Sequence, residues 1–501
     1  MKGRILMNKI NIGWGEVSIV PEGRKINLAG QFYERITDEV ETPITVTALA
    51  IDCDGEAAIF CSCDLCGVGT ALVRTVRNKL ANTAIPTDKI IMNAIHTHTS
   101  LSFAGNSDGI GGSSLSVLQA LLPDVEYEKL VSYEGEDLLE GNEAHEFLAE
   151  RIAMAIELAW NNKKEGMYAA GFGRAAVGMC RRVCYSDGSA KMWGDTDTAT
   201  FTELEGGNDS GIELIFTFDA DKKLTGVVAN IACPSQVLEH RNFISSDYWG
   251  KVKAILRKEY GSDINLLALC SAAGDQCPRD MIRWVEPETP INDPNIVRED
   301  VTVRKADPSM FDVKGCELIA KRISNEIIYA YEGLADGDFV CNTELVHKKL
   351  TVDMPLRRVT PEETEKAYRA IKEFAAENGS KPITFKDNAK MHIHAGIIVR
   401  SRAQESIDIV PIEVHILKLG NIAFATNPYE LFLDYGNKIR ARSKASQTFL
   451  VQLCCGSYGY LPTEKAEKGS HYSAYVSSGT SGHEGGDLLV RKTVTEINEM
   501  F

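Results

Sequence analysis

The chain is organised around Ile90-Ile91-Met92-Asn93-Ala94-Ile95-His96-Thr97-His98-Thr99, an apolar run that ends in two histidines one residue apart. Its β-branched and apolar side chains predict a buried strand. Residues i and i+2 of a strand point to the same face, so we expect the imidazoles of His96 and His98 to project side by side from the strand's C-terminal end. Loops at such strand ends carry functional sites in layered α/β proteins. A pair of hydrogen-bonded surface histidines is the structural alternative.

Size and charge limit the classes of function open to this chain. Its 501 residues can bury a large core, and its 44% apolar and 25% charged residues are ordinary for a globular protein. A net charge of −16 disfavours nucleic acid and anionic membrane surfaces as partners. No window approaches the roughly 18 consecutive apolar residues of a transmembrane helix, so we expect no integral membrane segment. A small molecule is the expected partner, and the sequence assigns no oligomeric state.

Two features indicate a reducing compartment. The N-terminal residues contain neither an apolar core segment nor a small-residue cleavage site, so they do not resemble a secretory signal peptide. The 13 cysteines are odd in number and are spread through the expected strands and loops. Such cysteines are typical of free thiols rather than of a disulfide framework. We therefore expect a cytoplasmic protein.

Apolar strands recur in pairs around turn residues, which predicts hairpins. The expected pairs are residues 44–51 with 57–61, 212–218 with 224–232, and 409–417 with 422–426. Helical spacing is found at residues 68–82, 144–162, 245–258, 314–332, 361–377 and 485–500. We predict an α/β fold of mixed β-sheets built from hairpins and sandwiched between helices. A single large catalytic domain would span residues 1–501, with an acidic insertion at about residues 105–143.

Polar loops follow several of the apolar strands and carry His, Cys, Glu or Tyr. Strand ends that converge on one side of a sheet would bring these groups together into a site. Residues 105–114, rich in Gly and Ser, follow the two histidines directly and would form a lid or a plain surface loop. Residues 284–310 are polar and rich in proline, and we expect them to form a long connection.

Short motifs along the whole chain carry a family resemblance. They are Trp14-Gly15, Leu28-Ala29-Gly30 with Arg35, Ile95 to Thr99, Phe243-Ile244-Ser245-Ser246-Asp247, Gly274-Asp275-Gln276-Cys277-Pro278, Glu430, and Tyr460 with Tyr472. In this order, from about residue 10 to the end, they resemble the neutral/alkaline ceramidase family, zinc-dependent amidases that cleave the N-acyl bond of ceramide. The chain ends soon after the tyrosines, so we expect a ceramidase-like catalytic domain standing alone, without that family's C-terminal immunoglobulin-like domain.

The resemblance implies a zinc site, because His96, Glu430 and Tyr460 match ligands of that family. A catalytic zinc keeps about three protein ligands and an open position for water. Cys233 stands where the family has its second ligand histidine, and a thiolate is a good zinc ligand. His240, a few residues further on, is another candidate for this position. An empty or degenerate metal site is the third possibility.

The resemblance also implies residues that act on the substrate. His98 would move protons or bind the substrate, and Arg181 would orient it. Tyr472 would donate a hydrogen bond to the oxyanion, a task worth about 3–4 kcal/mol for a well-placed donor. Cys277 stands where the family has its catalytic serine, and it is either a nucleophile or a passive substitution.

We therefore expect a zinc-dependent hydrolase that cleaves an amide (N-acyl) bond in a small or lipid-like molecule by metal-activated water. One alternative is a cysteine-nucleophile acyl hydrolase using Cys277, and another is a catalytically inactive ceramidase-like binding protein. No metal is expected at Cys61-Ser62-Cys63-x-x-Cys66 or at His392-Ile393-His394, since nothing nearby in sequence completes a ligand set. Asp247 is expected to start a helix rather than to act in catalysis.

Overall fold

The described part of the chain covers nearly all of the predicted elements. The computed structural model describes residues 8–31, 33–110, 113–129, 132–283 and 312–501. Outside them lie residues 1–7, the predicted polar connection at 284–310, and Gly111 and Gly112 of the predicted loop. The sheets, helices and site below are built from the described residues alone.

The predicted strand at Ile90 is β6 (Ile90–Ala94), the edge of the largest sheet. Among the described residues this sheet has nine strands, in the order β15-β14-β13-β8-β1-β4-β5-β6, with β17 beside β1. The others are β1 (Asn8–Ser18), β4 (Thr45–Cys53), β5 (Glu56–Cys63), β8 (Lys164–Arg174), β13 (Gly211–Asp219), β14 (Leu224–Ile231), β15 (Asn265–Cys270) and β17 (Asn342–Thr343). β6 is parallel to β5 and β15 is parallel to β14, whereas β4–β5 and β13–β14 are the antiparallel hairpins predicted.

A second sheet contains the third predicted hairpin. Its order is β18-β19-β20-β22, with β18 (Leu345–Pro355), β19 (Ile409–Leu419), β20 (Ile422–Thr426) and β22 (Gln447–Val451). β21 (Glu430–Leu431) pairs in parallel with β23 (Tyr460–Leu461) just beyond β20 and β22. The short strands are β2 (Lys25–Asn27), β3 (Ile36–Thr37), β7 (Leu138–Leu139), β9 (Met179–Cys180), β10 (Arg182–Tyr185), β11 (Ala190–Met192), β12 (Phe201–Leu204) and β16 (Gln276–Cys277).

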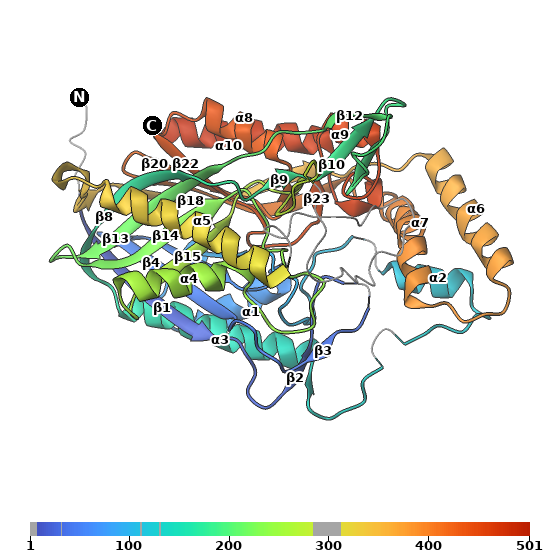
Figure 1. The fold of residues 1–501 in the computed structure, drawn as a ribbon, viewed down its shortest axis with the longest axis horizontal. Coiled ribbons are helices and arrows are strands. Elements are labelled where there is room, and N and C mark those ends of the chain that lie inside the picture. The colour runs from blue at the N-terminus through green and yellow to red at the C-terminus, as the bar shows by residue number, and fades with distance from the viewer. Residues whose placement is uncertain (1–7, 32, 111–112, 130–131, 284–311) are drawn as a thin grey trace.

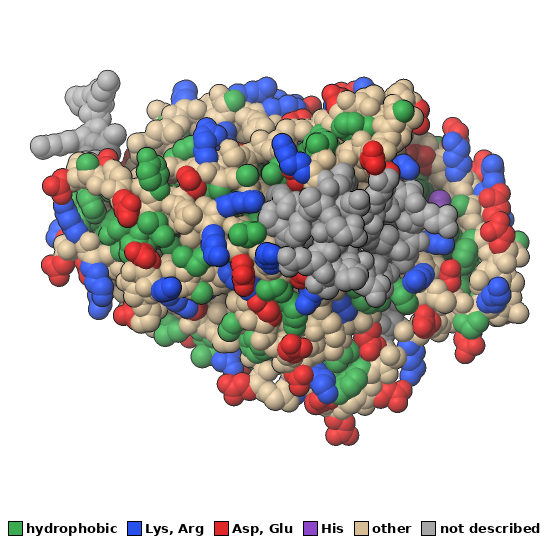
Figure 2. Space-filling model, in the orientation of Figure 1, with side chains coloured by type: hydrophobic (Ala, Val, Ile, Leu, Met, Phe, Trp, Pro, Cys, Tyr) green, Lys and Arg blue, Asp and Glu red, His purple; other side chains and the backbone are tan. Residues whose placement is uncertain are grey.

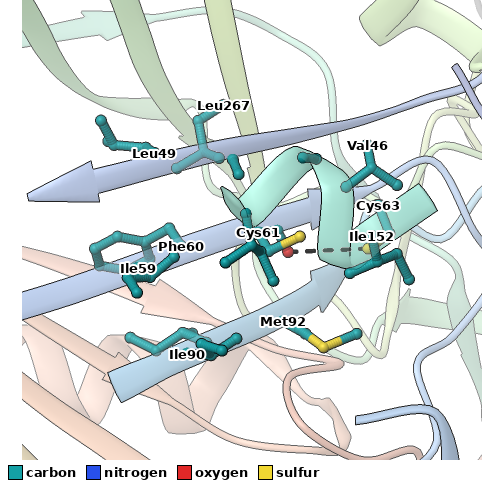
Figure 3. Close-up of a cluster of buried hydrophobic side chains, with 14 of the residues drawn as sticks. Val46, Leu49, Ile59, Phe60, Cys61, Cys63, Ile90, Met92, Ile152 and Leu267 are labelled. Atoms are coloured by element: carbon teal, nitrogen blue, oxygen red, sulfur yellow. Dashed lines mark hydrogen bonds between the residues drawn. The ribbon is translucent and has the colours of Figure 1, made fainter. Parts of the chain in front are cut away.

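The two sheets share a hydrophobic core. Phe60 of β5 packs on Phe424 of β20 with ring centroids 4.9 Å apart, and Phe424 stacks on Phe449 of β22 at 4.6 Å. On the other face of the large sheet, Ile152 of α3 (Gly141–Asn161) packs among strand side chains of β4, β5 and β6 (Figure 3). The approach of α3 requires Gly13, because a Cβ there would lie 2.1 Å from the carbonyl oxygen of Ala159.

Helices cover the outer faces of both sheets. Figure 1 shows α8 (Leu433–Arg442) and α10 (His483–Met500) on one side of the strands and α3 on the opposite side. α4 (Asp247–Tyr260) packs against α5 (Asp312–Glu332), which also contacts β8 and β13, and α1 (Thr70–Leu80) packs on α3. Of these helices, α1, α3, α4, α5 and α10 confirm predicted ones, within a few residues at the ends.

One group of helices extends the predicted architecture. α2 (Ser114–Leu121), α6 (Pro361–Asn378) and α7 (Phe385–Ala403) share a small apolar cluster that lies to one side of the sheets (Figure 1). α2 lies inside the predicted acidic insertion, and β7, at the end of that insertion, pairs with β2. The segment is therefore tied to the rest of the chain at both ends. α9 (Glu464–Gly469) lies near the C-terminus.

The surface carries both signs of charge. Figure 2 shows acidic and basic side chains interspersed over the face that it draws. On the described part of that face no extended basic area stands out of the kind that binds nucleic-acid phosphates. None of the helices in the described ranges is long and apolar enough to cross a membrane.

Candidate functional site

The two histidines meet just beyond the strand that delivers them. β6 ends at Ala94, and the backbone of His96 turns into the left-handed region at φ 66°, with its N–H donated to the carbonyl of Leu65 at 3.0 Å. The histidines thus follow the strand's C-terminal end, as predicted, but the alternation of a strand is not what brings the imidazoles together. The rings nonetheless lie side by side, with the Nε2 atoms of His96 and His98 3.3 Å apart.

The hydrogen bonds of His96 leave its Nε2 available. Nδ1 lies 2.7 Å from the carbonyl oxygen of Cys66, which only accepts, so Nδ1 carries a hydrogen. Nε2 of the neutral ring then presents a lone pair, and it lies 3.5 Å from Oε2 of Glu430. Burial lowers the pKa of His96, but Cys66 and Glu430 outweigh burial and raise it to about 9. The surroundings of this nitrogen thus favour a positive charge.

Glu430 and Tyr460 are brought together by backbone pairing. They are register partners in the parallel pair β21–β23, although thirty positions separate them in sequence. Gly459, at φ 75°, lets the residue before Tyr460 approach residues 478–479 closely, since a Cβ there would lie 2.4 Å from the carbonyl oxygen of Ser478. The hydroxyl of Tyr460 lies 3.1 Å from that of Tyr472. Burial and the charge of Glu430 raise the pKa of Tyr460 well above its ordinary value, so a nearby cation is needed to ionise it.

The spacing of these groups fits a zinc ion. Ligand atoms about 2.0–2.1 Å from a tetrahedral zinc lie roughly 3.3 Å from one another. Nε2 of His96 lies 3.5 Å from Oε2 of Glu430, close to this value. The Cys66 carbonyl orients His96 from behind, as the outer partners of metal-binding histidines do. The chemistry of His96, Glu430 and Tyr460 therefore suits zinc, and the spacing of His96 and Glu430 fits two ligands of one ion.

Arg181 lies beside the tyrosines as a buried cation. Its side chain is 2% exposed, and its Nη2 donates to the hydroxyl of Tyr460 at 3.3 Å and to the carbonyl of Gly274 at 3.2 Å. Its Nε has no hydrogen-bond partner among the described residues, and its guanidinium lies over the ring of Trp193. A fixed positive charge next to the Tyr460–Tyr472 pair suits the stabilisation of an anionic oxygen.

Gln236 and Glu239 belong to the site and were not found from the sequence. Oε1 of Gln236 accepts from Nη1 of Arg181 at 3.3 Å, and its Nε2 lies 3.3 Å from Nε2 of His98. Oε2 of Glu239 lies 3.7 Å from Nδ1 of His98. Both follow Cys233 within six positions, so the loop that carries the candidate ligands also supplies partners of His98.

Cys233 and His240, the candidates for the missing ligand, are both largely buried groups with shifted pKa values. The thiol of Cys233 is directed to the carbonyl of Pro234 at 3.4 Å, and burial raises its pKa well above the ordinary value. Burial and Arg241 lower the pKa of His240 to about 4. The proposed roles of Cys233 and His240 as zinc ligands stay predictions.

Cys277 is a buried thiol at the edge of the same region. It is 0% exposed, and its thiol is directed to the carbonyl of Arg279 at 3.4 Å. Burial raises its pKa to about 11, although Arg181 and Arg279 act in the opposite direction. A nucleophilic cysteine needs a lowered pKa and access for the substrate. The surroundings of Cys277 in this structure favour the neutral thiol.

The remaining singled-out residues lie in structural settings. Cys61 and Cys63 are part of the core (Figure 3), whereas Cys66 reaches the site, with its sulfur 3.9 Å from Nδ1 of His96. Asp247 begins α4, as expected, and its carboxylate accepts from the N–H groups of Leu238 and Tyr248. The histidines at 392 and 394 lie on α7.

Comparisons with known proteins identify the fold. No protein-family model matches the chain, and no curated protein matches it in sequence. The structure of neutral ceramidase from Pseudomonas aeruginosa matches with a TM-score of 0.65 and 15% identity, over 98% of this chain and 74% of that one. A ceramidase complexed with C2 matches with a TM-score of 0.65 and 14% identity, over 98% and 75%. The chain has the mixed α/β fold of neutral ceramidase, which confirms the predicted fold class.

Proposed function

We propose that this protein is a zinc-dependent hydrolase that cleaves the amide bond of a small or lipid-like N-acyl compound. One observation carries the proposal, namely the convergence of His96, Glu430 and Tyr460. Nε2 of His96 lies 3.5 Å from the carboxylate of Glu430, which is the register partner of Tyr460. The neighbours that share the fold are named as ceramidases, and the motif resemblance implies an N-acyl bond as the target.

The residues that would hold zinc are His96, Glu430 and Tyr460. Bound there, the ion would supply Lewis acidity, which polarises a carbonyl and makes water acidic enough to ionise near neutral pH. Tyr472 lies 3.1 Å from the hydroxyl of Tyr460, and Arg181 donates to the same oxygen. Together, Tyr472 and Arg181 would stabilise the negative charge that develops on the carbonyl oxygen of the substrate.

His98 is suited to proton transfer in this reaction. Burial, together with His96 and Arg35, holds its pKa well below the ordinary value, so the ring is neutral at pH 7. A neutral imidazole accepts a proton through its free nitrogen as water attacks, and returns the proton to the leaving amine. Its Nε2 faces Nε2 of His96 at 3.3 Å, next to the donors of the proposed metal site.

Cys277 as a covalent nucleophile is the second candidate mechanism. It follows from the position of this thiol near Arg181, whose charge acts to lower its pKa. Burial has the larger effect and raises that pKa to about 11, which leaves the thiol protonated at neutral pH. We therefore propose that Cys277 packs against the site without attacking the substrate.

We also propose that the chain acts as one catalytic domain in the cytoplasm. Its two large sheets share a core through Phe60, Phe424 and Phe449. All 13 cysteines are free thiols in the structure, the state that a reducing compartment maintains.

Hydrolysis of a chromogenic N-acyl compound tests the proposed function. Purified protein with added zinc is incubated with N-acyl-4-nitroanilides of increasing chain length, and release of the coloured amine is followed. We expect turnover by the wild type and by Cys277→Ser, and none above background by His96→Ala. Loss of turnover in Cys277→Ser, with an acyl adduct on Cys277 by mass spectrometry, would establish the thiol mechanism instead. Absence of turnover in the wild type over the series would favour a binding protein.

A further inference from the structure

We infer that Gln236 and Glu239 are positioning residues that hold His98 with its proton on Nδ1 and its lone pair on Nε2. The catalytic meaning of this arrangement rests on the proposed function, whereas the arrangement itself does not. Neither residue belongs to the motifs that carry the family resemblance, and both were placed at the site by the structure.

The orientation of the Gln236 amide follows from its neighbours. The guanidinium of Arg181 only donates, so the atom of Gln236 that lies 3.3 Å from its Nη1 must be the oxygen. The carboxylate of Glu239 only accepts, so the atom 3.3 Å from its Oε2 must be the amide nitrogen. The amide is thus held at both ends, and its remaining N–H is directed to Nε2 of His98 at 3.3 Å. A nitrogen that receives an N–H presents a lone pair.

Glu239 favours the same form of His98 from the other side of the ring. Nδ1 of His98 is buried and has no hydrogen-bond partner among the described residues, and Oε2 of Glu239 lies 3.7 Å away. A carboxylate stabilises an N–H and opposes a lone pair at this distance. One contact favours the other tautomer, the lone pair on Nε2 of His96 at 3.3 Å. A zinc ion bound to His96, as proposed above, would occupy that lone pair, and the contacts of Gln236 and Glu239 would then favour the same tautomer.

The backbone fixes the distance between His98 and Glu239. A single guanidinium, that of Arg35, donates to the carbonyl of His98 at 2.6 Å and to the carbonyl of Glu239 at 2.7 Å. The ring of His98 also packs against the backbone of Gly30, at φ 87°, where a Cβ would lie 2.4 Å from Nδ1. The imidazole is therefore restrained by packing and by polar partners at both nitrogens. This restraint fixes the direction of the Nε2 lone pair, which suits a group that transfers protons.

The tautomer is measured directly by 15N NMR of the full chain labelled at histidine, with zinc added and His98→Asn used for assignment. We expect wild-type His98 to carry its proton on Nδ1, and Gln236→Met and Glu239→Gln to shift the proton toward Nε2. His347 is the internal reference, because its Nδ1 donates to the carbonyl of Ala57 in a region remote in sequence from the changes. A proton on Nε2 of wild-type His98, or signals that both variants leave unchanged, would overturn the inference.

Kinetics provide the second arm. Removing such an outer partner typically costs about 10- to 100-fold, so we expect kcat of Gln236→Met and Glu239→Gln to fall by that factor. KM and zinc content should stay at wild-type values, since neither side chain is a proposed ligand. Glu143→Gln, which changes a surface carboxylate paired with Arg24, is the matched control and should leave kcat and the His98 signals unchanged. A variant effect on KM with kcat preserved would contradict the positioning role. If the wild type hydrolyses no N-acyl compound, the proposed function fails and the NMR result alone decides this inference.

Discussion

At His96 the backbone adopts φ 66°, a conformation that costs a non-glycine residue about 1–2 kcal/mol. Hydrogen bonds from the backbone of residues 94–97 to neighbouring loops hold this conformation. Strain of this kind persists where the surrounding structure over-determines it, and functional sites are where it is common. Here it directs the imidazole to Glu430 rather than along the line of β6.

Tyr472 gives a test of the proposed oxyanion contact. In Tyr472→Phe the ring keeps its packing and only the hydroxyl is lost, together with its contact to Tyr460 at 3.1 Å. Loss of one oxyanion donor costs about 10²–10³ in kcat. We expect a fall of that size in the initial rate of nitroanilide hydrolysis at saturating substrate, with zinc content unchanged. A rate within a factor of about three of the wild type would exclude Tyr472 as a donor to the transition state.

His96, Glu430 and Tyr460 were grouped from the family resemblance of the motifs that contain them, and the structure brings His96 close to Glu430. Gln236 and Glu239 could not be found in this way, since their contribution arises only when the loop after β14 folds against His98. The same holds for Cys66, which lies in a motif that was set aside and acts through its backbone carbonyl. Because every residue has a backbone carbonyl, residue identity does not indicate which carbonyl will orient a histidine.

At the scale of elements, the adjacent strands β18 and β19 carry a buried polar cluster of His347, His415 and Glu413, separate from the candidate site. Nδ1 of His347 donates to the carbonyl of Ala57, and burial and His415 lower its pKa to about 3, so its ring is neutral. Its Nε2 then accepts from Nδ1 of His415 at 2.8 Å. Nε2 of His415 lies 2.8 Å from Oε1 of Glu413, a hydrogen-bond distance, and must carry a proton. His415 is therefore an imidazolium, paired with Glu413 on the same strand.

This ion pair predicts a pH-dependent contribution to stability. The partners of Glu413 outweigh burial and lower its pKa, so its contribution is present above its ordinary value of 4.5 and is lost as pH falls through the lower folded value. Burial acts against His415, but Cys455 and Glu413 raise its pKa overall. Its contribution is present below its ordinary 6.5 and is lost as pH rises through the raised value. Between pH 4.5 and pH 6.5 both groups are charged, and the ion pair makes its full contribution to stability.

Glu413→Gln should therefore lower the free energy of unfolding most near pH 5.5. Breaking a buried pair costs about 3–5 kcal/mol, and Arg77 and Lys349, which also pair with Glu413, lose a partner as well. Urea unfolding at several pH values measures the difference from the wild type. We expect this difference in unfolding free energy to become smaller toward acid pH, as Glu413 is protonated. It should also become smaller at alkaline pH, as His415 loses its charge. A difference independent of pH would contradict the assignment.

Helices and strands whose apolar residues recur at a regular spacing could be predicted from the sequence, whereas elements that depend on tertiary contacts could not. The hairpin of β4 and β5 was indicated by Asp54-Gly55, whose φ values of 55° and 91° are those of a type I′ turn. α7 was not predicted, because its buried face is a small cluster shared with α2 and α6 rather than a stripe facing the main core. α2 was hidden by the acidic composition around it.

For the whole molecule, packing of the two sheets determines where the site forms. β6 of the large sheet delivers His96, whereas β20 and β22 of the second sheet lead to Glu430 and Tyr460. The aromatic contacts among Phe60, Phe424 and Phe449 join the sheets. Sequence patterns predicted the strands, but the packing of the two sheets on each other follows from side-chain contacts that periodicity does not encode.

Phe424→Ala tests whether the aromatic contacts of Phe424 hold the two sheets together. The ring is 2% exposed, and removing a buried phenylalanine costs about 3–5 kcal/mol of unfolding free energy. We expect a loss of that size in urea unfolding, together with weaker zinc binding, because Glu430 follows β20 in the chain. Phe172→Ala, at a position 48% exposed, is the matched control and should change stability by less than about 1 kcal/mol. A loss for Phe424→Ala no larger than that of the control would show that the sheets are held elsewhere.

Zinc stoichiometry tests the central claim most directly, that His96, Glu430 and Tyr460 hold one divalent ion. The wild type, His96→Ala, Glu430→Gln and Tyr460→Phe are each equilibrated with zinc, freed of unbound metal and analysed for metal and protein. The account predicts about one zinc per wild-type chain, less than about a tenth of that in His96→Ala and Glu430→Gln, and weakened binding in Tyr460→Phe. A wild-type chain that binds no zinc, or His96→Ala and Glu430→Gln variants that bind as much as the wild type, would contradict it.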